Sequence, residues 1–209
     1  PITESLPELR TLPDWEHPDS QHSALRRFGR TTLNVIFYPS SFYRNLSTRV
    51  GRRASRRFAR LHVLITSLLL GLAGFLQFQW LVSPGYLANS VIGTLAWTAL
   101  FSLLTYGSLA TTTHLAARLT AWEARFRGYR LPYPVVLRGL DYHTPHYLPV
   151  ALGALGTVAG YQTLLATGIW SEASAPTYLY VLCAEVVLSA GYLFWTYWLA
   201  MRNMLFANR

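Results

Sequence analysis

The sequence predicts an all-α fold: a polytopic transmembrane helical bundle of about four spans, preceded by basic amphipathic helices at the membrane surface. Three observations predict it. The composition is 52% hydrophobic and only 13% charged, against roughly 25% charged residues in an average soluble domain. Long apolar runs fill most of the chain after residue 60. Backbone polar groups in lipid must also be satisfied internally, so these runs are expected to be helices.

Charge changes sign along the first 60 residues. Residues 1–24 are acidic, and we expect them to form an extended tail. Residues 25–60 form an arginine-rich arm without any acidic residue, and the chain contains no lysine. The net charge of +9 suits either nucleic acid or a membrane surface as a partner. The apolar runs that follow favour the membrane, so we expect no nucleic-acid partner.

The arm predicts two short helices lying on the membrane. In the first, the apolar side chains near one face are Leu25, Phe28, Leu33, Ile36 and Phe37. Pro39 breaks that helix, and a second can restart at Ser40 or Ser41 with Phe42, Leu46 and Val50 turned inward.

The arm arginines are candidate contacts for anionic lipid head groups or for an acidic partner. Basic amphipathic helices bind such head groups, and each arginine near the surface contributes about 1 kcal/mol. The candidates are Arg26, Arg27, Arg30, Arg52, Arg53, Arg56, Arg57 and Arg60. The alternative is a solvated charged face that only sets the membrane topology.

Residues 61–209 are predicted to form the membrane domain. A helix rises about 1.5 Å per residue, so about 20 apolar residues cross the hydrocarbon core. The windows that meet this requirement are residues 61–82, 87–117, 147–170 and 177–201. The second window is longer than a span needs, so its last turns should project past the hydrocarbon.

The distribution of arginine predicts the topology. The arm, the connector at 118–138 and the chain end carry arginines, whereas the loops near residue 84 and at 171–176 carry none. By the positive-inside bias, both termini and the connector lie on the cytoplasm-like side. This topology suits a multi-pass protein of a bacterial inner membrane, or of an organellar membrane with similar orientation.

Four histidines fall on that side and form a candidate metal or haem cluster. They are His62, His114, His143 and His146. Converging histidines can bind haem, copper or zinc. However, Pro145 undermines a regular ligand-bearing face between the last two. Hydrogen bonding to a carbonyl or to water is commoner for an interfacial histidine, so we expect no metal and no cofactor.

The stretch from Arg138 to Pro149 is interpreted as the entry to the third span. Pro145 and Pro149 favour an extended approach followed by the first turn of a helix. Asp141 can cap that helix or pair with Arg138, and Tyr142 is expected to anchor the chain at the interface.

Glu185 is an acid inside a predicted span, which makes it a functional candidate by default. Gln162 and Gln77 lie at similar depth on other spans. These residues can belong to a proton or cation pathway, or they can form hydrogen bonds between helices. No second titratable group completes a relay, which favours hydrogen bonding. Close helix approach is expected at Gly156 and Gly160, against this chain or another protein.

Three stretches carry a family resemblance: PDWEHP at 13–18, RRFGRTTLNVIFYPSSFYRNL at 26–46, and the run from Thr113 to Tyr161. They resemble bacterial members of the Yip-one domain family, small membrane proteins related to the Ypt/Rab-interacting proteins of eukaryotes. The resemblance covers most of residues 13–209 and implies a polytopic bundle with a cytoplasmic amino end and no enzyme activity. The family usually has five spans and often a cysteine ribbon, whereas this chain shows four windows and only Cys183.

The sequence predicts a non-enzymatic membrane scaffold or accessory subunit within a larger membrane complex. It contains no nucleophile–base pair, phosphate loop, dinucleotide fingerprint or carboxylate dyad. The expected partners are anionic lipid head groups and other membrane protein subunits. The alternatives are a small transporter or channel that uses Glu185, a haem-binding redox subunit that uses the histidines, and a trafficking role with a small GTPase.

Overall fold

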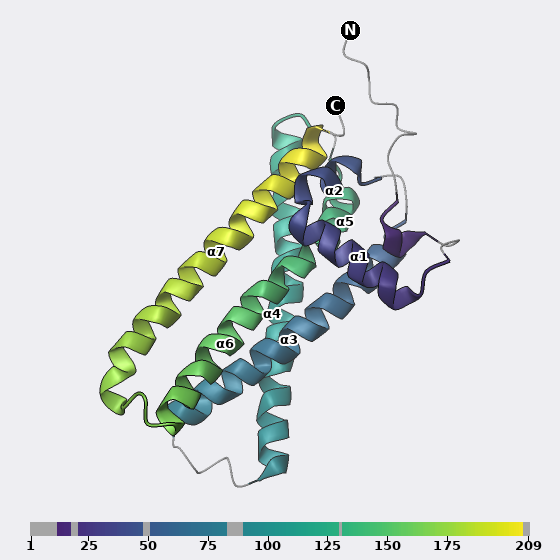
Figure 1. Cartoon of the computed structure of the whole chain (residues 1–209). Coiled ribbons are helices and arrows are strands. Elements are labelled where there is room, and N and C mark those ends of the chain that lie inside the picture. The colour runs from purple at the N-terminus through teal and green to yellow at the C-terminus, as the bar shows by residue number, and fades with distance from the viewer. Residues whose placement is uncertain (1–11, 18–20, 48–50, 83–89, 130, 207–209) are drawn as a thin grey trace. The chain divides into compact units, whose positions relative to one another are not determined.

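The computed structural model describes residues 12–17, 21–47, 51–82, 90–129 and 131–206, and every regular element within them is a helix (Figure 1). Within these described residues, four segments are long and apolar enough to cross a membrane: Arg53–Trp80, Val91–Phe126, Tyr133–Ala166 and Ala175–Met204. The predicted all-α fold with about four spans is therefore confirmed. By the length and composition of these helices, the chain is a multi-pass membrane protein.

The helices follow one another with short connections. They are η2 (Asp14–Glu16), α1 (Ala24–Phe37), α2 (Pro39–Asn45), α3 (Arg53–Val82), α4 (Val91–Phe126), α5 (Tyr133–His143), η3 (Thr144–His146), α6 (Tyr147–Ala166), η4 (Glu172–Ser174) and α7 (Ala175–Phe206). Local signals set several ends. The Ser23 side chain caps α1 by accepting from the backbone N–H of Arg26, and Pro39 occupies the first turn of α2, where its missing N–H costs little.

Three spanning helices extend beyond the windows predicted for them, and one of them, α7, runs over Ala175–Phe206 against the predicted 177–201. The helix α3 begins at Arg53, inside the predicted arm, so the second arm helix is only the short α2 and residues 53–60 belong to the first span. The helix α4 continues to Phe126, past the predicted end at 117. Arginine and alanine are strong helix formers, and α4 ends where Gly128 adopts a φ of 77°. There the N–H of Tyr129 bonds to the Ala124 carbonyl, a glycine-terminated helix end.

The predicted extended approach to the third span is wrong. Thr144 has helical backbone angles, φ −56° and ψ −29°, and α5 passes through the single turn η3 into α6. Pro145 is accommodated because one 3₁₀ turn does not need its missing N–H. The Thr144 hydroxyl also donates to the Asp141 carbonyl at 2.8 Å.

The chain divides into two compact units. Unit 1 comprises Pro1–His62, Thr111–His146 and Phe194–Arg209. The described part of its core brings Val35 of α1 and Tyr43 of α2 together with Phe58, Leu137 and Tyr142. The arm helices therefore pack on their own chain. The predicted apolar face of α1 is only partly used: Thr31 and Val35 are its buried residues, whereas Leu25, Leu33 and Phe37 are exposed.

Unit 2 comprises Val63–Ala110 and Tyr147–Leu193. Aromatic rings from three helices and a loop cluster within it: Trp80 contacts Tyr161 and Tyr178, and Tyr161 also contacts Trp170. The rings of Tyr161 and Tyr178 stack with centroids 4.0 Å apart. Tyr178 is buried, at 2% exposure.

Glycine permits close helix approach in unit 2, but not where it was expected. A Cβ atom at Gly71 of α3 would lie 2.7 Å from the backbone nitrogen of Ser102 in α4, so only glycine fits there without movement. Nothing among the described residues lies within 4 Å of a Cβ built at Gly156 or Gly160. Those positions are open to lipid or to another protein.

Candidate functional site

The most strongly built polar site lies on one face of α5 in unit 1. Arg138, Asp141 and Tyr142 are spaced three and four residues apart, so they project from the same side of the helix. All three are buried, with exposures of 2%, 3% and 0%. Each meets a partner from the amino-terminal part of the chain.

Arg138 binds the tail and the segment that precedes α3. Its Nη2 donates to Glu16 Oε2 at 2.7 Å, its Nε to the Ser47 carbonyl at 3.0 Å, and its Nη1 to the Gly51 carbonyl at 3.1 Å. The Tyr142 hydroxyl donates to the other Glu16 oxygen. We call Glu16, Arg138 and Tyr142 the Glu16 cluster. Tyr142 is therefore a buried partner of a carboxylate within unit 1, rather than the interface anchor that the sequence predicts.

Asp141 pairs with Arg52, and the predicted pair with Arg138 is wrong. Arg52 donates from Nε to Asp141 Oδ2 at 2.8 Å and from Nη2 to Oδ1 at 3.2 Å, a bidentate geometry. The Ser55 hydroxyl donates to Oδ2 at 3.0 Å. Asp141 therefore fixes the start of α3 against α5. Arg138 is already occupied by Glu16, which explains the exchange of partners.

The described part of the acidic tail is a docked turn, so the prediction of an extended tail is wrong for residues 12–17. Besides Glu16, the Trp15 backbone N–H donates to the Thr31 hydroxyl at 3.0 Å, and its indole N–H donates to the Ala54 carbonyl at 2.9 Å. Residues 1–11 and 18–20 of the predicted tail lie outside the described residues.

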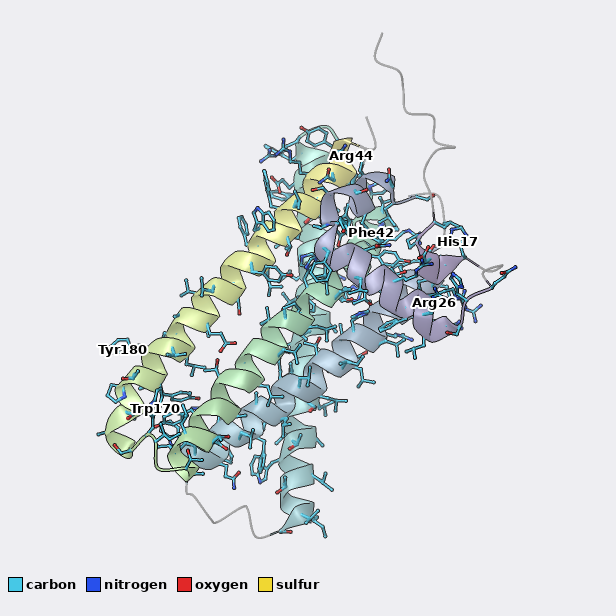
Figure 2. All side chains as sticks on the ribbon, in the orientation of Figure 1. His17, Arg26, Phe42, Arg44, Trp170 and Tyr180 are labelled. Atoms are coloured by element: carbon cyan, nitrogen blue, oxygen red, sulfur yellow. The ribbon has the colours of Figure 1, made fainter. Side chains whose placement is uncertain are left out.

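The candidate lipid-binding arginines fall into two groups. Arg52 is in the ion pair with Asp141, and Arg27 Nη1 donates to the His17 carbonyl at 2.6 Å. The exposed ones are Arg26, Arg30, Arg53, Arg56, Arg57 and Arg60. Figure 2 labels Arg26 at the outer end of α1 and Arg44 on α2. Arg53, Arg56, Arg57 and Arg60 occupy the first turns of α3, a helix long and apolar enough to span a membrane.

Of the four candidate histidines, His143 and His146 are in ring contact with each other. The rings of His143 and His146 have centroids 4.9 Å apart, and His143 Nε2 is 3.0 Å from the Thr196 hydroxyl. His62 bonds to the Thr32 hydroxyl and the Phe58 carbonyl. His114 bonds to the Tyr133 hydroxyl at 2.9 Å on an exposed face. Across the described ranges, no group of three or more His, Cys, Asp or Glu side chains converges as metal ligands.

The intramembrane polar candidates lie in unit 2, and two of them form hydrogen bonds between helices. Gln162 Nε2 donates to the Leu76 carbonyl at 2.7 Å, linking α6 to α3. Gln77 Oε1 accepts from the Tyr178 hydroxyl, linking α3 to α7. Glu185 lies apart from both bonds. Its Oε1 sits 3.0 Å from where a Gly153 Cβ would lie, and its Oε2 is buried without a hydrogen-bond partner among the described residues.

Glu16 was not identified as a functional or structural residue from the sequence. The sequence context of Glu16 could have indicated its role. Glu16 is an acidic residue in a stretch that contains a tryptophan and is flanked by prolines, and the arginine-rich arm that follows contains no acidic residue. Asp141 and Arg138 were identified, but their partners lie 89 and 122 positions away. Spacing along the chain cannot identify such partners.

No family model, curated protein or solved structure matches this chain. The resemblance to the Yip-one domain family therefore stays a prediction from the quoted motifs.

Proposed function

We propose that this protein is a non-enzymatic scaffold or accessory subunit of a larger membrane complex. One observation supports this most directly. In α4 and α7, only 6% of the most apolar window is buried within the chain, against 39% in α3. Exposed side chains on α7 include Val187, Leu188 and Phe194, at 69%, 73% and 69%. Such surfaces require acyl chains or helices of another protein as neighbours.

The arginine-rich arm gives this subunit a defined orientation under the proposal. Arg53, Arg56, Arg57 and Arg60 occupy the first turns of α3, directly before its apolar part. They bind anionic head groups there, with both termini and the 118–138 connector on the cytoplasm-like side. We propose a bacterial inner membrane, or an organellar membrane of similar orientation, and membership of a Yip-one-like group of membrane proteins.

Site-specific photo-crosslinking in native membranes tests the scaffold proposal. A photo-reactive phenylalanine analogue at Val187 should give a discrete protein adduct, because this side chain faces outward from α7. The same analogue at Ala200, which is 0% exposed, is the matched control and should give none. Lipid adducts alone at Val187, and at further exposed positions on α4 and α7, would contradict a role as a subunit.

A second candidate is a small proton or cation carrier that uses Glu185. The observation in its favour is the buried Oε2, which has no hydrogen-bond partner among the described residues. An ionisable side chain within a membrane-spanning helix is a candidate site on a proton or cation pathway. In proteoliposomes, Glu185→Gln should abolish ion flux while leaving expression unchanged. Flux equal to that of the parent protein, or no flux in the parent, would eliminate this candidate.

A further inference from the structure

The carboxyl-terminal half of α4 has large apolar side chains outside and small ones inside. The buried stripe is Thr113, Ala117, Thr120 and Ala124, each at most 8% exposed. The outer stripe is Leu115, Leu119, Trp122 and Phe126, at 54%, 57%, 68% and 83% exposed. Both sets follow spacings of three and four residues, so each runs along one side of the helix. The outer stripe requires an apolar neighbour.

A groove of about 570 Å³ lies beside the outer stripe, within unit 1. Trp122 and Arg125 line it from α4, Tyr129 and Pro132 line it from the turn that leads into α5, and Tyr133 lines it from the first turn of α5. The hydrogen bond between His114 and Tyr133 ties the start of α5 back to α4. The groove therefore has one wall from α4 and one from the turn and the start of α5, with aromatic rings and one guanidinium group.

The charge at this groove is positive and unbalanced. Glu123 is already paired with Arg127 at 2.7 Å. Neither Arg118 nor Arg125 has an ion-pair or side-chain hydrogen-bond partner within the described part of the chain. A second copy of the chain would bring the same positive charge to this face, whereas an anionic lipid brings the opposite charge.

The length of α4 places this groove at the depth of lipid head groups. Its 36 residues make a helix about 54 Å long at about 1.5 Å per residue. A bilayer with its head groups is about 40–45 Å thick, and an average tilt of about 20° shortens the helix only slightly along the normal. A helix of this length reaches the head groups at both ends. All charged residues of α4 lie from Arg118 to Arg125, so this end is the one suited to anionic head groups.

We propose that this groove binds one anionic phospholipid. Arg125 contacts its phosphate, and Trp122 and Phe126 contact the glycerol region and the upper acyl chain. A guanidinium group matches phosphate geometry by bidentate hydrogen bonding, and indole rings are stable at head-group level. The inference rests on the proposed membrane placement, and it adds a lipid site that is separate from the arginine-rich arm.

Native mass spectrometry of the purified full chain in mild detergent tests this site. Phosphatidylglycerol should give persistent adducts, one of them at the groove, and phosphatidylcholine at the same concentration should give much less. Arg125→Gln should weaken phosphatidylglycerol binding about fivefold, the equivalent of about 1 kcal/mol for one arginine. Trp122→Ala should weaken it as well. Arg127→Gln is the matched control, because this arginine directly follows α4 but is already paired with Glu123.

Four outcomes would overturn the inference. Equal binding of the two lipids would show that charge does not determine binding. Equal losses of phosphatidylglycerol binding in Arg125→Gln and Arg127→Gln would show that the groove is not the binding site. A protein dimer lost in Trp122→Ala, without a lipid adduct, would identify a second copy as the occupant. An arm variant, Arg56→Gln with Arg57→Gln, separates the two proposals. If only this variant loses phosphatidylglycerol, lipid binding by the arm stands and the groove site fails.

Discussion

The Arg138 guanidinium and the Glu16 carboxylate form an ion pair at 2.7 Å with both side chains 2% exposed. The partners are 122 positions apart in the chain. A buried pair of this kind adds little stability compared with apolar residues of the same volume, but removing one partner leaves a buried charge without compensation. The pair therefore ties the tail to α5 and makes unit 1 sensitive to either residue.

Arg138→Met should lower the free energy of unfolding by about 3 kcal/mol. The substitution leaves the Glu16 carboxylate buried beside Tyr142 without its cation, and it also removes the donors to the Ser47 and Gly51 carbonyls. Thermal unfolding in detergent, followed by tryptophan fluorescence, measures the loss. Arg127→Gln, which breaks an exposed pair, should cost less than about 1 kcal/mol. Equal losses in the two variants would show that the Glu16 pair is not buried.

Glu16→Gln should be less harmful in the background of Arg138→Met than in the parent protein. Once the cation is gone, neutralising the carboxylate removes an uncompensated charge. The two substitutions should therefore be strongly non-additive in a double-mutant cycle. Simple addition of their separate effects on unfolding would mean that the two side chains do not interact.

Asp141→Asn should loosen the start of α3. The substitution removes the carboxylate that accepts from Arg52 and Ser55, and hydrogen bonds to charged groups contribute about 1.5–3 kcal/mol each. Hydrogen exchange of a peptide covering residues 52–60 should become roughly tenfold faster. A peptide from the middle of α7 is the internal control. Unchanged exchange at residues 52–60 would show that Asp141 does not hold this end of the helix.

Gly71→Ala should destabilise unit 2 by about 1–3 kcal/mol. The added Cβ would meet the backbone of Ser102, with the nitrogen at 2.7 Å and the Cα at 2.8 Å, so α3 and α4 must separate. Gly156→Ala is the matched control, because a Cβ there meets nothing within 4 Å among the described residues. Thermal unfolding should show the control to be unchanged or slightly more stable. A loss at Gly156 as large as at Gly71 would contradict the described packing.

The fold class could be predicted from the sequence because crossing a membrane is a local requirement. A window such as 61–82 carries enough apolar residues to identify a span without knowledge of its neighbours. The ends of the helices are harder to predict from the sequence. The arginines at residues 53–60 predict a polar arm, although arginine also favours a helix. The predicted boundary between the arm and α3 is therefore wrong.

The polar site was only partly accessible from the sequence. The sequence identifies Arg138, Asp141 and Tyr142 as candidates. It also predicts that Asp141 pairs with Arg138, the nearest opposite charge along the chain. In the structure, Arg138 instead pairs with Glu16, and Asp141 pairs with Arg52. Pairing of this kind depends on how α5 packs against the amino-terminal segments. No local spacing rule contains that information.

The most direct measurement of the central claim is labelling of single cysteines with a membrane-impermeant maleimide in sealed membranes. Cys183→Ala provides the background, and a cysteine is introduced in turn at Ser41, Arg127 and Ala173, all exposed. Four crossing helices predict that Ser41→Cys and Arg127→Cys react from one side and Ala173→Cys from the other. Reaction of Ser41→Cys and Arg127→Cys from opposite sides, or of all three from the same side, would contradict the account.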